Sequence, residues 1–423
     1  MSKDNNKKTP KVRFPGFDKD WEERKLGEVC DFINGDRSSN YPSDADFQDS
    51  GIPFVGSDSL GATFVNKNKL RFISCEKYKQ MKGLKIQDKD ILYTLRGAGF
   101  GKCSISDFFD GTVASSLVGI RCNEEELEPY FFVQWLNSAN AGNEKKKAVN
   151  GSTAQNISVD DMKKYMIYLP LQDEQQKVGA YFRNLDHLIT LHQRKLEKLK
   201  EYKKGMLQKM FPKNGEKIPE VRFSGFDGEW EERKLSELAT MHARIGWQNL
   251  RTSEFLDNGD YMLITGTDFN DGVVNYSTCH YVEKERYEQD KNIQIHNGSI
   301  LITKDGTLGK VAYVQGLTMP ATLNAGVFNI EIKDKKTTDE KYLYQYLKAP
   351  FLMDYVSKKA TGGTIKHLNQ NILVDFPVAI PEKAEQQKIG SFFQDLDRLI
   401  TLQQKKIESL KEFKKGCLQQ MFV

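Results

Sequence analysis

The strongest constraint on the fold is a long stretch, Asp173 to Phe211, that recurs almost unchanged from Ala384 to Phe422. In both copies apolar residues alternate at spacings of three and four, which is the heptad pattern of a coiled-coil helix. The predicted seam residues are Leu185, Ile189, Leu196, Leu199 and Met206 in the first copy and Leu396, Ile400, Ile407 and Leu410 in the second. We therefore expect two matched long helices.

Polar residues interrupt each seam at two matching steps. They are His192 and Lys203 in the first copy and Gln403 and Lys414 in the second. Buried polar heptad positions can fix the register of paired helices, and we expect His192 and Gln403 to do so. Glycine costs about 1 kcal/mol relative to alanine inside a helix, so fraying or a kink is expected at Gly205 and Gly416.

A second repeat precedes each globular segment. Pro10 to Leu26 and Pro219 to Leu235 share the phrase Arg-Phe-x-Gly-Phe-Asp, followed closely by Trp-Glu-Glu-Arg-Lys-Leu. We expect its aromatic side chains to anchor the segment on the body of its domain rather than to stack on bases. The order of tag, globular segment and long helix thus occurs twice, which indicates an internal duplication.

The globular segments mix short apolar runs with turns, which predicts two α+β, or mixed α/β, domains. Strand-like runs are Ile52–Val55, Ile91–Leu95, Leu117–Arg121, Tyr261–Thr265, Ser299–Thr303, Lys310–Val314 and Val327–Ile332, and short helices are predicted at Tyr130–Asn137 and Tyr342–Lys348. The predicted boundaries are a flexible tail at 1–9, a first domain at 10–170, a helix at 171–212, a linker at 213–218, a second domain at 219–381 and a helix at 382–423.

Composition limits the cellular setting more than the function. The chain has a formal net charge of +4, which is compatible with a nucleic-acid binder without requiring one. Its six cysteines form no Cys-x-x-Cys pair, so reduced structural thiols in a cytoplasm are expected. No export signal or membrane-length apolar run is visible, which predicts a soluble cytoplasmic protein.

A glycine-rich phrase from Arg96 to Lys102 resembles a phosphate-binding loop, but its spacing is wrong. Gly97 and Gly101 are separated by three residues instead of four, and Cys103 follows the lysine where Ser or Thr should bind magnesium. The second half has a related turn from Lys304 to Lys310. Two interpretations stay open: a plain hairpin, or a hairpin that presents Arg96, Lys102, Lys304 and Lys310 to DNA phosphates or guanine.

A polar turn occurs at the same point of each half, shortly before the long helix. Its candidate DNA-contacting residues are Ser152, Thr153 and Gln155 in the first half and Thr364, Lys366 and His367 in the second. Such side chains offer the donors and acceptors that read base edges or phosphates. The same residue types are ordinary in loops, so a purely structural turn is the alternative.

Catalytic motifs are missing from the sequence. The six histidines show no metal-binding spacing, and neither an Asn-Pro-Pro-aromatic methylation motif nor a helicase-type ATP site is present. The lysine-rich faces of the long helices are interleaved with glutamates, which favours a solvated coiled-coil face over a DNA-binding stripe. The matched seams are most simply covered by each other, as an antiparallel pair with pseudo-two-fold symmetry.

Taken together, the sequence resembles the specificity subunit of type I restriction-modification enzymes over essentially its whole length. The resemblance is carried by Glu-Gln-Gln-Lys at Glu174 and Glu385, Leu-Asp-x-Leu-Ile-Thr-Leu at Leu185 and Leu396, Lys-Lys-Gly-x-Leu-Gln at Lys203 and Lys414, both tags, and Asp305-Gly-Thr-Leu-Gly-Lys310. The first half departs from the last phrase by one inserted residue.

The resemblance implies that each globular domain is a target recognition domain for one half of a split, asymmetric site in double-stranded DNA. The helices are then expected to set the gap between the half-sites and to dock two modification subunits. Those partners would bind S-adenosylmethionine and methylate adenine, and restriction subunits would add ATP- and Mg²⁺-dependent translocation and cleavage. No cofactor is expected on this chain itself.

Two other functions stay open at this point. One is a nucleotide-hydrolysing enzyme that uses the loop from Gly97 to Lys102, which would bind ATP tightly as an isolated chain. The other is a DNA-binding regulator that acts alone. It differs from a specificity subunit because it would bind its DNA site without a modification partner.

Overall fold

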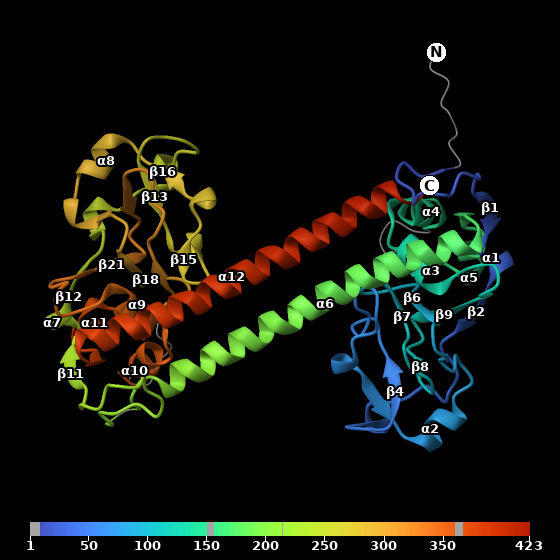
Figure 1. Cartoon of the computed structure of the whole chain (residues 1–423), viewed down its shortest axis with the longest axis horizontal. Helices are drawn as coiled ribbons and strands as arrows, with labels where there is room; N and C mark the ends of the chain where they lie inside the picture. The colour runs from blue at the N-terminus through green and yellow to red at the C-terminus, as the bar shows by residue number, and fades with distance from the viewer. Residues whose placement is uncertain (1–8, 150–155, 214, 360–366) are drawn as a thin grey trace, which may run out of the picture. The chain divides into compact units, whose positions relative to one another are not determined.

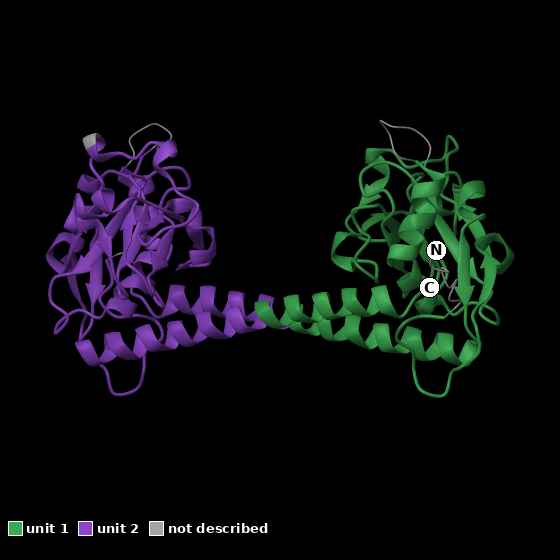
Figure 2. Cartoon of the chain, turned by 90° about the horizontal axis from the view of Figure 1, so that it is seen from above, with its two compact units in different colours: residues 1–194, 404–423 green, residues 195–403 purple. Residues whose placement is uncertain are grey.

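A computed structural model describes residues 9–149, 156–213, 215–359 and 367–423, and the chain divides into two compact units. Unit 1 comprises residues 1–194 and 404–423, and unit 2 comprises residues 195–403 (Figure 2). The boundary falls inside both long helices, so each unit takes half of each helix. The domain boundaries that the sequence predicts divide the chain differently and stay a prediction.

Unit 1 contains two four-stranded sheets and a two-stranded ribbon. The first sheet has the order β2-β9-β6-β7, formed by Cys30–Asn34, Leu117–Cys122, Ile91–Thr94 and Cys103–Ile105. The second has the order β3-β5-β4-β8, formed by Phe47–Gln48, Arg71–Ile73, Ile52–Val55 and Thr112–Val113. The ribbon pairs β1 (Glu22–Lys25), just after the first tag, with β10 (Met166–Leu169), just before the long helix.

The helices of unit 1 are α1 (Leu26–Val29), α2 (Cys75–Gln80), α3 (Pro129–Leu136), α4 (Ala139–Ala148) and α5 (Val159–Met162), followed by α6 (Gln172–Lys209). In unit 1, α3 packs on β7 of the first sheet, whereas α2 lies beside the second sheet (Figure 1). Pro129 begins α3 at a position where no helical hydrogen bond is lost, and the Glu128 carboxylate accepts from Phe131 N at 2.6 Å. The helix therefore starts where the sequence can cap it.

Unit 2 repeats this plan with more strands. Its large sheet has the order β12-β21-β18-β19-β15-β14, formed by Ala239–His242, Val327–Ile332, Ile300–Thr303, Val311–Tyr313, Val273–Val274 and Phe269–Asn270. A smaller sheet has the order β16-β13-β20-β17, formed by His280–Tyr281, Met262–Ile264, Ala321–Leu323 and Gln294–Ile295. The ribbon pairs β11 (Glu231–Lys234) with β22 (Pro377–Ile380).

The helices of unit 2 follow the same order as those of unit 1. They are α7 (Leu235–Leu238), α8 (Lys284–Glu288), α9 (Glu340–Lys348), α10 (Phe351–Lys359) and α11 (Gln370–Val374), followed by α12 (Lys383–Gln420). The predicted strands correspond to β4, β6, β9, β13, β18, β19 and β21, and the predicted short helices to α3 and α9. The mixed helix and strand class is confirmed. The fraying expected at the glycines is wrong, because α6 and α12 continue past Gly205 and Gly416.

Within each unit the two helix halves lie side by side and run antiparallel (Figure 2). In unit 1 the Phe182 and Phe422 rings stack at 5.9 Å, and Lys414 reaches Asp186 at 2.7 Å. In unit 2 the Phe211 and Phe393 rings stack at 5.8 Å. Increasing residue numbers on one helix meet decreasing numbers on the other, as the sequence predicts for matched seams.

Burial along the seam follows the heptad. Gln403 and six apolar seam residues are buried, and His192 is half-buried along with two more apolar ones. The buried apolar residues are Leu185, Ile189, Leu196, Leu396, Ile400 and Ile407, and the half-buried ones are Leu199 and Leu410. Met206 is also half-buried and packs on the core of unit 2, beside buried Leu207. The end of each helix therefore leaves the seam and joins a domain core.

Candidate nucleic-acid interface

The glycine-rich phrase of each half forms a hairpin loop at the end of the central buried strand. In unit 1 the loop is closed by Thr94 N donating to Lys102 O at 2.9 Å and Gly101 N donating to Thr94 O at 3.0 Å. In unit 2 Thr303 N donates to Lys310 O at 3.0 Å and Gly309 N to Thr303 O at 2.9 Å. Gly101 and Gly309 have φ of 79° and 69°, which favours glycine at this turn. The unit 1 loop is one residue longer.

This geometry excludes a nucleotide-binding loop of the P-loop type. Such a loop leads from a strand into a helix, whose N-terminus holds the phosphates. Here the loop leads from β6 into β7, and the two strands pair antiparallel with Leu92 opposite Ser104. The nucleotide-hydrolysing alternative therefore loses the feature on which it depended.

In both units the residues that directly follow the polar turn bond to the hairpin. In unit 1 Ile157 N, just after the turn, donates to Leu95 O at 3.1 Å. In unit 2 Leu368 N donates to Lys304 O at 2.8 Å. These hydrogen bonds match Lys304 with Leu95, so Arg96 corresponds to Asp305 and the two loops present different chemistry. The two turns stand at equivalent points of the sequence, but only the fold brings the residues after them to the hairpins.

The predicted DNA-contacting residues differ in their exposure and in their bonding partners. Arg96 is exposed and donates to Ser115 O at 2.9 Å, whereas exposed Lys102 and Lys310 have no charged partner among the described residues. Lys304 is half-buried, with its ammonium 5.6 Å from the centre of the Phe328 ring, and exposed His367 shares a 2.5 Å hydrogen bond with Asp305. The predicted residues Ser152, Thr153, Gln155, Thr364 and Lys366 lie outside the described residues.

A buried ion pair that the sequence did not reveal fastens the tag to the helix. Arg13 donates to both carboxylate oxygens of Glu174, from Nε at 2.6 Å and from Nη2 at 2.7 Å. In unit 2 Arg222 binds Glu385 in the same way, at 2.7 and 2.8 Å. The carboxylate in turn raises the pKa of each arginine. The repeated tag arginine and helix glutamate were the available signal, but their pairing required the fold.

The neighbouring glutamine of each helix fastens the domain to the helix. Gln175 accepts from Glu128 N at 3.0 Å and donates to Glu126 O at 2.9 Å. Gln386 accepts from Asp339 N at 2.8 Å and donates to Thr337 O at 3.0 Å. The Glu-Gln-Gln-Lys phrase thus fixes the position of each domain on its helix half. The position of the hairpin follows from that of the domain.

A second buried polar cluster joins the two helices to each domain. In unit 1 Asp186 accepts from Lys414 at 2.7 Å, from Gln134 at 3.0 Å and from Thr63 at 2.7 Å. The Lys414 side chain is 11% exposed and that of Asp186 is 8% exposed. The lysine at this polar step of the heptad therefore forms a buried ion pair and is not solvated.

Unit 2 has the same cluster with one more charge. Asp397 accepts from Lys203 at 2.6 Å and from Gln345 at 2.9 Å, and Lys348 lies 3.5 Å away. Two ammonium groups share one carboxylate. Burial, together with the charge of Lys348, lowers the pKa of Lys203 to about 8.

An exposed apolar strip follows the helix face that points away from each domain. At 3.6 residues per turn, Leu188 and Leu191 lie about 160° and 140° round α6 from Asp186, which contacts the domain. Leu191 is 54% exposed and its counterpart Leu402 is 53% exposed. The full set is Leu188, Leu191 and Phe413 in unit 1 and Leu399, Leu402 and Tyr202 in unit 2. Exposed apolar groups repeated at matched positions indicate a binding surface.

Comparison with known proteins decides the family. A family model described as the type I restriction modification DNA specificity domain matches residues 18–201 and again 227–412. The chain belongs to this specificity family. Its duplicated organisation therefore corresponds to two specificity domains in tandem, and as a specificity subunit it is a DNA-recognition component and not an enzyme.

Relatives of this specificity subunit span nearly its full length. Two come from Methanocaldococcus jannaschii: the type I restriction enzyme MjaVIII specificity subunit, 20% identical over 98% of this chain and 94% of its own, and the putative MjaX specificity subunit, 22% identical over 98% and 95%. The EcoR124I/EcoR124II specificity subunit from Escherichia coli is 23% identical over 44% of this chain and 48% of its own.

Solved structures show the same fold. The S subunit of a type I restriction-modification system from M. genitalium matches with a TM-score of 0.62 and 16% identity, over 98% of this chain and 99% of its own. A chain from a study of assembly and conformational transition in the type I R-M system matches with a TM-score of 0.55 and 16% identity, over 96% and 98%.

Among the residues described, no group of three or more His, Cys, Asp or Glu side chains is placed to hold a metal ion. Across the same residues, no helix is both long enough and apolar enough to cross a membrane.

Proposed function

We propose that each unit reads one half of a bipartite, asymmetric DNA site through the edge formed by its hairpin and polar turn. The observation that supports this proposal is that the two hairpins share one backbone arrangement but present different side chains. The two hairpins close with the same hydrogen bonds, yet one offers Arg96 where the other offers Asp305 bonded to His367. One chain can then recognise two unlike half-sites, with Lys102 and Lys310 contacting phosphates.

The partners follow from the same proposal. Two modification subunits that carry S-adenosylmethionine dock on the paired helices, and restriction subunits supply ATP- and Mg²⁺-dependent cleavage, all in the cytoplasm. The exposed apolar strips support docking, since they recur at matched positions and face away from the domains. Each strip offers one site, which suits two copies of a modification subunit.

The decisive experiment is a methylation map. The chain is co-expressed with its modification and restriction subunits, and methylated adenines are mapped across the host genome. We expect a single bipartite motif. Exchange of residues 219–381 for another recognition domain should change one half of the motif and leave the other half intact. No motif, or a change in both halves, would refute the proposal.

Single substitutions test the edge itself. Lys102→Gln and Lys310→Gln should each weaken DNA binding by the assembled complex at all sequences. Each should also reduce the slope of log affinity against log salt by about one, because one phosphate contact is lost. Lys79→Gln on α2 removes an exposed lysine away from the hairpin and serves as the control. An unchanged slope in both hairpin variants would remove these lysines from the interface.

Docking is tested separately from DNA recognition. Leu191→Glu and Leu402→Glu place a charge in the strip of unit 1 and of unit 2, so each should lower the number of modification subunits bound from two to one. The double variant should bind none, as measured by the mass of the purified complex. Glu197→Gln, at an exposed α6 position, should leave the complex intact. Full assembly of the double variant would place docking elsewhere.

A further inference from the structure

Three segments of unit 1 meet at Arg96, the first exposed residue of the hairpin. The Arg96 guanidinium donates from Nη2 to Ser115 O at 2.9 Å, in the turn that follows β8. Its backbone forms an antiparallel bridge with Asn156, the last residue of the polar turn. The hairpin, the turn after β8 and the end of the polar turn therefore converge on one residue.

Arg96 and Asn156 have adjacent, exposed side chains. Residues directly opposite each other in an antiparallel pair point their side chains to the same face, and both residues are exposed. The next residue, Ile157, is 4% exposed and its N donates to Leu95 O at 3.1 Å, so the pair is anchored on buried backbone. Apart from its bond to Ser115 O, the guanidinium has no hydrogen-bond partner among the residues that the structure describes. Its remaining N–H groups are available to a ligand.

Unit 2 brings the same segments together around different side chains. Because the hydrogen bonds after the two polar turns match, Asp305 is the counterpart of Arg96. By the same match, His367 is the counterpart of Asn156. Asp305 Oδ1 and His367 Nδ1 share a hydrogen bond of 2.5 Å, and their side chains are 42% and 70% exposed. A Cβ on Gly326, in the turn that follows β20, would lie 3.6 Å from Asp305 Cβ. Each unit therefore presents a polar pair at the same place.

The two pairs differ in hydrogen-bonding character. Arg96 offers donors only, and arginine typically pairs with the O6 and N7 acceptors of guanine in the major groove. Asp305 keeps its Oδ2 without a hydrogen-bond partner in the described part of the chain, and a carboxylate typically accepts from the N4 amino group of cytosine. Because backbone phosphates repel a carboxylate, Asp305 suits a base edge better than the DNA backbone.

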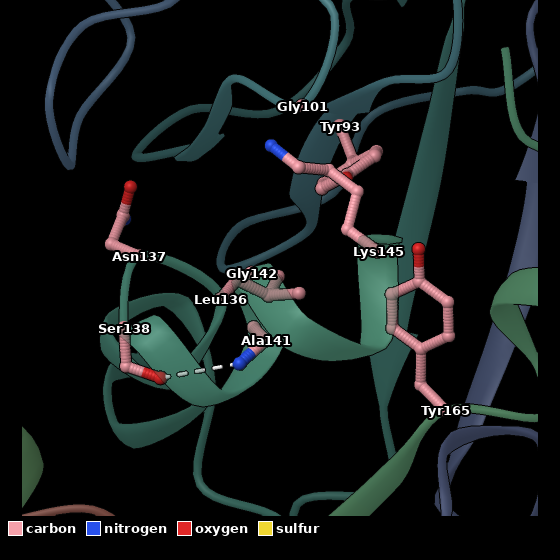
Figure 3. Close-up of a pocket in the computed structure, with 9 residues that line it drawn as sticks. All are labelled: Tyr93, Gly101, Leu136, Asn137, Ser138, Ala141, Gly142, Lys145 and Tyr165. Carbon is pink, nitrogen blue, oxygen red and sulfur yellow. Dashed lines mark hydrogen bonds between the residues drawn. The ribbon is translucent and has the colours of Figure 1, made fainter. Parts of the chain in front are cut away.

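The hairpin of unit 1 also has a positive charge behind it. A cavity of about 190 Å³ adjoins the hairpin, and its lining includes Tyr93, Gly101, Lys145 and Tyr165 (Figure 3). A Cβ on Gly101 would lie 2.6 Å from Lys145 Nζ, so this ammonium reaches the hairpin backbone. In unit 2 the side chain of Met353 takes the corresponding place. The edge of unit 1 is therefore the more positive one, which suits the electronegative O6 and N7 edge of guanine.

We propose that Arg96 and Asp305 are equivalent base-reading residues. Arg96 recognises the guanine of one G·C pair in the half-site of unit 1, and Ser115 O orients its guanidinium. Asp305 recognises the cytosine of one G·C pair in the half-site of unit 2, and His367 orients its carboxylate. These assignments rest on the proposed function, since they place bases within the bipartite site.

Methylation maps of complexes that carry single substitutions test these assignments. Arg96→Ala should make one G·C position of one half-motif degenerate, and Asp305→Ala should do the same in the other half. His367→Ala should relax the same position as Asp305→Ala. The Arg96 and Asp305 variants should bind the parent site about 5- to 150-fold more weakly, with a much smaller change on unrelated DNA. Arg251→Ala removes an exposed arginine outside these segments and should leave the motif unchanged.

A base analogue tests the guanine contact directly. A duplex with 7-deazaguanine at the relaxed position lacks the N7 acceptor, so it should bind the parent complex more weakly than the normal site does. The Arg96→Ala complex should bind both duplexes equally. Equal weakening of parent and variant by the analogue would overturn the assignment of Arg96.

Two further results would overturn the base-reading role. One is a bipartite motif that both alanine variants keep unchanged, which would leave the proposed function standing. The other is an equal loss of affinity at all sequences with a lower salt slope, which would make Arg96 a phosphate contact. Absence of a bipartite motif in the parent complex would instead refute the proposed function, and the base assignments with it.

Discussion

At the scale of single residues, one carboxylate in each unit, buried in unit 1 and half-buried in unit 2, connects both helices to a domain. Asp186 and Asp397 each accept from a lysine of the opposite helix and from a glutamine of a short domain helix, Gln134 of α3 or Gln345 of α9. A buried ion pair stabilises little by itself, because desolvation offsets the attraction. Breaking such a pair is costly, because it leaves one charge buried without a partner. The pair therefore favours a single register of the two helices.

The first residue-scale prediction concerns this penalty. Asp186→Leu leaves the Lys414 ammonium buried without a counter-ion and should lower the free energy of unfolding by about 3–5 kcal/mol. The double variant Asp186→Leu with Lys414→Met removes both charges and should recover most of that loss. Urea unfolding of the chain measures both values. A double variant as unstable as the single one would show that packing, and not charge, decides stability here.

The second residue-scale prediction concerns how the free energy of unfolding depends on pH. Since the pKa of Lys203 is lowered to about 8, the unfolded chain holds this proton between pH 8 and about 10.5 while the folded chain has lost it. Stability rises with pH wherever the unfolded state binds more protons, so this group makes the protein more stable as pH increases through that window. Lys348→Met removes the repelling charge and should weaken the increase. Unfolding free energies of both proteins at about pH 7.5, just below the window, and at about pH 9.5, inside it, test this. Equal increases would exclude the Lys348 charge as the cause.

At the scale of elements, glycine occurs in two different settings within the long helices, one open and one tightly packed. A Cβ on Gly205 or Gly416 would meet no atom within 4 Å, although both lie inside a helix. A Cβ on Gly179 would lie 3.0 Å from Phe131 N, and one on Gly390 would lie 2.8 Å from Tyr342 N. The latter pair allows each domain to approach its helix closely.

Alanine substitution should therefore have opposite effects along one helix. Gly205→Ala and Gly416→Ala should each stabilise the protein by about 1 kcal/mol, because alanine has the higher helix propensity and space is free. Gly179→Ala and Gly390→Ala should destabilise it, since the short helix of the domain must move away. Thermal unfolding of the four variants is the measurement. Stabilisation by Gly179→Ala would contradict the close packing described here.

Many of the helices and strands could be predicted from the sequence. Continuous apolar runs such as 91–95 and 327–332 identified the central strands, and the heptad identified both long helices with their antiparallel pairing. The shortest strands escaped prediction, because a two-residue strand such as Val273–Val274 carries no periodicity of its own. Their positions depend on partners distant in sequence, as when β15 joins the parallel partner β19.

At the scale of the whole molecule, the residues of the two ion pairs are spaced equally along both helices. Asp186 and Lys203 are 17 residues apart on α6 (203 − 186), and Asp397 and Lys414 are 17 apart on α12 (414 − 397). Both pairs can form together only while these separations are equal. The duplicated sequence guarantees that equality, since both helices derive from one pattern.

Insertion of one heptad between Asp186 and Lys203 should therefore prevent one of the two pairs from forming and lower the melting temperature. A second heptad between Asp397 and Lys414 restores the match and should restore stability. The matched variant is about 10 Å longer at 1.5 Å per residue, so under the proposed function its methylated motif should gain a gap of about 3 bp. An unchanged gap in the matched variant would mean that the helices do not set the spacing.

The sequence by itself determined the duplication, the heptad and its polar steps, the mixed class of the domains and the lack of catalytic motifs. These features depend on local patterns, which a repeated chain displays twice. Only the tertiary structure decided that the lysine steps form ion pairs, that Arg13 meets Glu174, that the residues after each polar turn bond to the hairpin, and that Tyr93, Lys145 and Tyr165 line one cavity. These relations join residues far apart along the chain, and their energies depend on burial, which no local pattern records.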